Sequence, residues 1–172
     1  MDHIFLTARF LIGIVFAVSL TAKFRAGGWG TFLESIEGLA PRLPARATAV
    51  VVALVEAGAI ATLVIPDAAA YGLMAAALLL VSFTIALLRA IRRRSSVSCG
   101  CFGTSETPVG KLHVARNVLL TAGACAGIAA SVQPAAGAPG WQGSITAAAV
   151  GSVAAVMAVL TDEMADLFRT RS

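Results

Sequence analysis

The sequence predicts an all-α fold, a polytopic membrane bundle of four to five transmembrane helices that forms one domain over residues 1–172. The chain is 58% hydrophobic and only 13% charged, and its mean hydropathy is +0.87. Soluble domains contain roughly 25% charged residues, so the polar side chains here are too few to cover a water-soluble globule. The apolar residues also fall into separate stretches near the roughly 20 residues that a helix needs to cross a bilayer.

The predicted spans are about 4–24, 47–65, 68–91, 113–132 and 144–160. The first starts almost at Met1 and contains Arg9, which favours a retained helix over a cleaved signal peptide. The last is short and rich in Ala and Gly, and whether it crosses decides between four and five spans. The predicted location is the inner (plasma) membrane, as a multi-pass protein.

Two connections have recognisable local signals. Between the first and second spans, apolar residues recur at helical spacing, which predicts a short amphipathic helix in the membrane interface: Phe32, Leu33, Ile36 and Leu39. Pro41 and Pro44 follow and should end that helix. Pro66 and Asp67 predict a tight turn between the second and third spans.

The basic residues indicate an orientation. With five spans, the basic loops 25–46 and 92–112 and the tail 161–172 fall on one side, and the loops on the other side contain no Lys or Arg. The positive-inside rule places the basic side in the cytoplasm and the N-terminus outside. The net charge of +4 does not indicate nucleic-acid binding, because the basic residues lie between apolar spans rather than on a soluble module.

The strongest chemical signal is Cys99-Gly100-Cys101-Phe102-Gly103, in the polar loop between the third and fourth predicted spans. Cysteines two residues apart can reach the Cα separation of a disulfide, and Gly100 permits unusual backbone angles. Small, strained and exposed disulfides are typically the labile ones. The pair therefore predicts thiol–disulfide exchange, with nearby basic residues favouring the thiolate. The run Arg92-Arg93-Arg94 is better explained as a topology anchor.

Two other interpretations of the cysteines remain open. The pair could staple the loop of a non-enzymatic assembly or scaffold protein. Cys99, Cys101 and His113 could also hold copper or zinc, although the paired CXXC spacing of common zinc sites is missing; we expect no metal. Cys125 lies about twelve residues into the fourth span, roughly 18 Å below His113, and is expected to be a packed core residue.

Glu56 falls near the centre of the second span, where a charge costs about 2.5–3.5 kcal/mol and normally has a partner. Counting from the basic side, Glu56 lies roughly 14 Å deep and Arg9 roughly 22 Å deep, a difference that an Arg side chain can span. Lys23 lies almost at the basic surface, so Arg9 is the predicted partner. The alternative is a protonated Glu56 that takes part in proton movement.

Lys23, Arg116 and Asn117 lie near the same surface as the cysteines and could line the mouth of the bundle around them. The simpler interpretation is that Lys23 and Arg116 snorkel to the headgroups. Asn117, one turn inside the fourth span, could bond a neighbouring helix.

Several of these residues together resemble known membrane families. Arg9, Gly13, Phe16 and Lys23 in the first span are similar to the pattern of DoxX-like membrane proteins. The CGCFG run, followed by Arg116-Asn117, resembles the methylamine utilisation protein MauE family, and an intramembrane Glu56 fits the same pattern. The resemblance covers most of residues 4–132.

This resemblance implies a helical-bundle membrane protein linked to disulfide chemistry, which helps a secreted amine dehydrogenase mature beside a thioredoxin-like partner. It implies that Cys99 and Cys101 are the redox pair. Four further residues match by motif, and their roles stay unassigned: Glu56, Lys23, Arg116 and Asn117. Partners are then a thioredoxin-like or other thiol protein and the lipid bilayer. No cofactor is evident, and a quinone acceptor is not readable from the sequence. An exported client favours outward-facing cysteines, whereas the charge pattern favours the cytoplasmic face.

Overall fold

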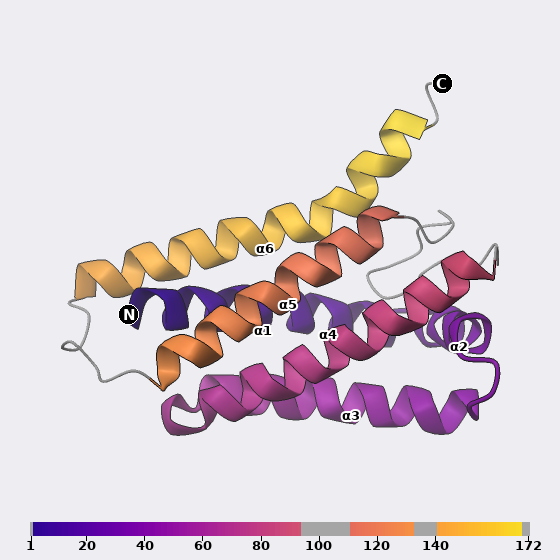
Figure 1. The fold of residues 1–172 in the computed structure, drawn as a ribbon, viewed down its shortest axis with the longest axis horizontal. Helices are drawn as coiled ribbons and strands as arrows, with labels where there is room; N and C mark the ends of the chain where they lie inside the picture. The colour runs from indigo at the N-terminus through magenta and orange to yellow at the C-terminus, as the bar shows by residue number, and fades with distance from the viewer. Residues whose placement is uncertain (1, 94–110, 133–140, 170–172) are drawn as a thin grey trace.

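The computed structural model describes residues 2–93, 111–132 and 141–169, and within these ranges the protein consists of helices without a strand. The helices run in the order α1 (Asp2–Phe24), α2 (Gly28–Leu39), α3 (Ala45–Val64), the short 3-10 helix η1 (Pro66–Ala68), α4 (Ala69–Arg92), α5 (Lys111–Ser131) and α6 (Trp141–Arg169). They form an elongated bundle in which α2 lies at one end (Figure 1).

Five of the six α-helices in the described ranges, all except α2, are long and apolar enough to cross a membrane. The helices confirm the all-α class. The predicted turn at Pro66 is also confirmed, as the short 3-10 helix η1 between α3 and α4. The predicted boundaries lie within a few residues of the observed ones except at the end of α6, which continues to Arg169 rather than stopping near residue 160. Residues 161–169 are too polar for a membrane span but contain neither Gly nor Pro, so nothing in their sequence breaks the helix.

Helix α1 is the central element, because it packs against α3, α5 and α6 and also contacts α2 and α4. The main core cluster joins α1 to its neighbours through Ile12 and Phe16 of α1, Leu73 of α4, and Leu120 and Ala124 of α5. Two smaller clusters at the α2 end join α2 to α4 and α2 to α3 without α1. Helix α1 therefore anchors the main core, and its packing there determines where the polar residues on its last turns lie.

Helix α2 begins after a sharp turn that only glycine permits. Gly27 has φ 81°, a left-handed conformation, and a Cβ at Gly28 would overlap the carbonyl oxygen of Ala22. The turn brings α2 back against α1, α3 and α4. Its buried side is formed by Phe32, Ser35, Ile36 and Leu39. The predicted amphipathic helix is therefore confirmed, and it covers the end of α1.

Helix α6 lies along α1, and small residues allow this close approach (Figure 1). A Cβ placed on Gly151 would lie only 2.7 Å from the carbonyl oxygen of Thr7 and 3.0 Å from the Cβ of Phe10. In membranes, small residues let helix backbones approach and gain van der Waals contact. The Ala and Gly residues give this span few large apolar side chains, and they are also what allows α6 to pack closely against α1.

We predict that Gly151→Leu separates α6 from α1, because the backbone of Thr7 cannot yield to a large side chain. The expected loss is at least the 1–3 kcal/mol typical of overpacking, measured as the free energy of unfolding in mixed micelles. Ala149→Leu is the matched control, since Ala149 is exposed on the same helix. Equal stability of the two variants would contradict this packing of α6.

Candidate functional site

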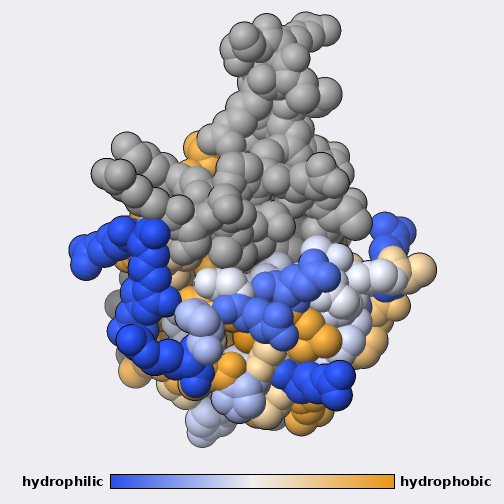
Figure 2. Space-filling view, turned by 90° about the vertical axis from the view of Figure 1, so that its right-hand side faces the viewer, coloured by the Kyte–Doolittle hydropathy of each residue, from blue (hydrophilic) through white to orange (hydrophobic). Residues whose placement is uncertain are grey.

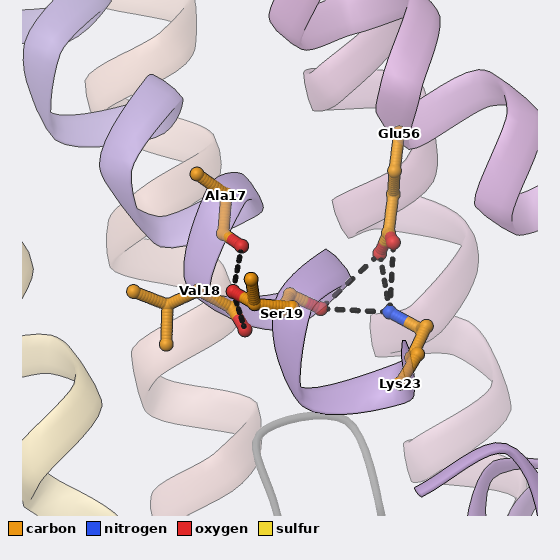
Figure 3. A network of polar contacts seen from close by, with 6 residues as sticks. Ala17, Val18, Ser19, Lys23 and Glu56 are labelled. Atoms are coloured by element: carbon orange, nitrogen blue, oxygen red, sulfur yellow. Dashed lines mark hydrogen bonds and ion pairs between the residues drawn. The ribbon is translucent and has the colours of Figure 1, made fainter. Parts of the chain in front are cut away.

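A network of buried polar side chains joins α1 and α3 near the α2 end of the bundle. The ammonium of Lys23 lies 2.7 Å from Oε2 and 2.8 Å from Oε1 of Glu56. It also donates a hydrogen bond of 2.8 Å to the hydroxyl of Ser19, which in turn donates to Oε1 of Glu56 at 3.3 Å. Figure 3 shows the three side chains converging from the two helices. Their exposed fractions are only 1% for Lys23, 3% for Glu56 and 4% for Ser19.

Three helices position this network. Ser19 and Lys23 are four residues apart on α1, the spacing that places two side chains on one helix face. Glu56 reaches them from α3, and the ring centroid of Phe32 on α2 lies 4.6 Å from the Lys23 ammonium. A cation over an aromatic face is attracted by the negative charge density of the ring. Helices α1, α2 and α3 together therefore enclose the Lys23 side chain.

The network satisfies the groups that it buries. A lysine ammonium has three hydrogen-bond donors, and that of Lys23 contacts three oxygen atoms. Removing one member of a buried ion pair leaves an uncompensated charge, which typically costs 3–5 kcal/mol. Lys23 and Glu56 must therefore be considered together, and a change in either one acts on the other.

The predicted pairing of Glu56 with Arg9 is wrong. The guanidinium of Arg9 instead donates hydrogen bonds to the carbonyl oxygens of Leu63 and Val64, the latter at 2.6 Å. It therefore caps the C-terminal end of α3, where carbonyl groups lack helical partners and a positive charge is favourable. Arg9 acts at the opposite end of α3 from α2.

The prediction failed because it assumed that α1 and α3 end at the same membrane surface and counted the depth of each residue from there. Helix α2 packs over the end of α1, so Lys23 is inside the protein rather than at the membrane boundary. Figure 1 also shows α3 continuing beneath α2, beyond the end of α1. The last turn of α1 is thus level with a middle turn of α3, which brings Lys23 to Glu56.

Helix α5 adds a second group of buried polar residues, His113, Arg116 and Asn117, which are 6%, 7% and 6% exposed. Spacings of three and four residues place them on one face of the first turns of α5. Of the two interpretations given for Lys23 and Arg116, snorkelling to the headgroups is wrong, since both side chains are buried. Cys99 and Cys101 lie outside the described residues, so their proximity to these side chains stays a prediction.

Cys125 is exposed rather than packed in the core, which corrects the prediction for this residue. The buried stripe of α5 runs through Leu120, Ala124 and Gly127, and Cys125 is turned away from it by about 100°. Sequence reasoning also missed the roles of Ser19 and Phe32. The four-residue spacing of Ser19 and Lys23 was a usable signal, whereas nothing in the sequence brings Phe32 over Lys23.

We predict that Glu56→Gln destabilises the protein by about 3–5 kcal/mol, because it leaves the Lys23 ammonium buried without a counter-charge. Adding Lys23→Met should restore at least half of the loss, since no charge then remains and methionine adapts to the space. The measurement is the free energy of unfolding by sodium dodecyl sulfate titration in mixed micelles.

Arg9→Leu provides the control in the same background. It should restore nothing, because the Arg9 side chain is bonded to the end of α3. A Glu56→Gln protein as stable as the wild type, or rescue by Arg9→Leu instead of Lys23→Met, would contradict the observed pairing.

Comparison of the sequence with known proteins identifies a family for this chain. The family model described as methylamine utilisation protein MauE matches residues 1–130, which include α1 to α4 and nearly all of α5. The methylamine utilization protein MauE of Paracoccus denitrificans is 33% identical over 160 residues, which cover 88% of this chain and 80% of that protein. No solved structure matches the chain. The extent of both matches shows that this helical protein, with five helices long and apolar enough to cross a membrane in its described part, belongs to the MauE family.

Proposed function

We propose that this protein exchanges thiols and disulfides with a protein partner through Cys99 and Cys101. Its role would be in methylamine utilisation, as an aid to the maturation of an exported enzyme such as an amine dehydrogenase. The observation that supports this most is the charged network of Lys23 and Glu56, buried at the α2 end of the bundle. At that same end α4 stops at Arg92 and α5 starts at Lys111, so the CXC segment is tethered there (Figure 1).

The buried charges favour a functional rather than a purely architectural interpretation. A well-packed apolar core is often as stable as one with a buried ion pair, or more so. Ionisable residues inside membrane spans are therefore uncommon, and they usually mark a site of function. Here Lys23 and Glu56 occur at the end to which the cysteines are tethered, and the outer surfaces of the spans remain apolar.

The chemistry needs a thiolate and a resolving thiol. The thiolate of one cysteine attacks the partner disulfide, forming a mixed disulfide and releasing one partner thiolate. The second cysteine then attacks the mixed disulfide, closes the Cys99–Cys101 disulfide and releases the other partner thiolate. Two electrons thus pass to the partner, and its two thiolates take up the protons. Arg116 lies thirteen residues beyond Gly103, the last residue of the CGCFG run, and supplies a buried positive charge on α5 that would favour the attacking thiolate.

A trapping experiment tests the exchange step. In Cys101→Ser the mixed disulfide formed by Cys99 has no resolving thiol, so a covalent complex with the partner should accumulate; Cys99→Ser tests the reverse assignment. The complex should appear on non-reducing gels after acid quenching and disappear with reductant. Cys125→Ser is the matched control and should trap nothing. If neither CXC variant traps a partner and both support normal enzyme maturation, the pair is a structural staple and the proposal fails.

The orientation of the pair follows from charge. With five spans, the end that contains α2 and the basic residues Arg25, Arg42 and Arg46 is predicted to be cytoplasmic. In a Cys125→Ser background, intact cells treated with mild reductant and a membrane-impermeant maleimide should therefore remain unlabelled at Cys99 and Cys101. Labelling should appear only after the membrane is opened. Rapid labelling in intact cells would reverse the orientation and would favour direct exchange with an exported client.

A further inference from the structure

A groove at the α2 end of the bundle is separate from the Lys23–Glu56 network. It lies between the segment that follows α2 and the outer face of the last turns of α4, and its volume is about 450 Å³. Its walls include the apolar Leu43 and Ile85, which are 54% and 42% exposed. The volume is within the range of roughly 300–1,000 Å³ that is usual for small-molecule sites.

Three arginines line this groove, and they come from two different parts of the chain. Arg89 and Arg93 are four residues apart at the end of α4, and Arg42 comes from the connection between α2 and α3. Among the lining residues in the described part of the chain there is no carboxylate. Arg92 is adjacent to Arg93 in sequence but does not line the groove. The groove is therefore lined by some of the basic residues at this end and not by others.

The lining changes from apolar to basic along the helix axis. Ser82, Ile85, Arg89 and Arg93 follow one another at spacings of three and four residues, so they form one stripe on α4. At 1.5 Å per residue the stripe is roughly 16 Å long, with its arginines toward the end of the bundle and its apolar residues toward the middle. Figure 2 looks onto this end, where hydrophilic side chains lie beside apolar ones.

Charge and shape together indicate an amphipathic anion. A planar guanidinium can bond two phosphate oxygens at once, which makes arginine a preferred phosphate ligand. Basic pockets beside transmembrane helices suit anionic headgroups, while an apolar wall open to the bilayer suits an acyl chain. Arginines at the end of a helix also offset its dipole and anchor topology, but neither effect accounts for Arg42, which lies outside the helices.

We propose that this groove binds one anionic phospholipid, with its phosphate between Arg42, Arg89 and Arg93 and an acyl chain along Leu43 and Ile85. The lipid would join the α2–α3 connection to α4 at the membrane boundary. This site is independent of the cysteines, and the proposed thiol exchange can fail without affecting it.

Lipid retention by the purified protein tests the proposal. Protein in a neutral detergent is titrated with phosphatidylglycerol or with phosphatidylcholine of the same acyl chains, and bound lipid is counted by native mass spectrometry. Phosphatidylglycerol should bind in a one-to-one complex and phosphatidylcholine should not. Changing Arg42, Arg89 or Arg93 to Gln should weaken binding about fivefold each, the effect expected for one surface arginine.

Arg92→Gln and Arg46→Gln are the matched controls, because they remove the same charge at the same end but outside the groove. Both should change binding less than twofold. An equal loss in the control variants would show non-specific attraction to a basic surface and would overturn the proposal. Competition by glycerol 3-phosphate at the affinity of the lipid would also overturn it, in favour of a soluble phosphate ligand.

Discussion

The ion pair of Lys23 with Glu56 is the interaction on which the arrangement of this bundle depends. A membrane-spanning helix cannot leave a charge in hydrocarbon, so each of these residues constrains where the other must be. Their contact at 2.7 Å fixes the last turn of α1 level with a middle turn of α3. It also requires α2, whose Phe32 covers the ammonium, to lie across the end of α1.

The features that were predictable from sequence are local ones. Hydropathy located the five apolar helices, and the spacing of Phe32, Ile36 and Leu39 located α2. The partner of Glu56 was not predictable, because it depends on how far one helix is shifted along another. Cys125 was misplaced for a related reason: composition around a residue does not reveal which side of the helix faces the bundle.

The two ends of the bundle differ in the kind of residues that they bury. At the end away from α2, Arg9 caps α3 and Gly151 allows α6 to approach α1, and both features are explained by packing and hydrogen bonding alone. At the α2 end, the Lys23–Glu56 network and the polar face of α5 are buried, although a well-packed apolar core is often as stable as one that contains a buried ion pair. Helix α4 ends and α5 begins at this second end, so the segment between them, which contains the CXC pair of the proposed exchange, is connected there.

The most direct test of this account is a solid-state NMR measurement on the protein in lipid bilayers, with ¹⁵N in the lysine side chains and ¹³C in the glutamate carboxyl groups. The account predicts a strong dipolar contact between Lys23 Nζ and the carboxyl carbon of Glu56. This contact should disappear in the Glu56→Gln protein, because that protein lacks the labelled carboxyl group. A Lys23 ammonium that instead shows contacts to lipid phosphate and none to Glu56 would contradict it.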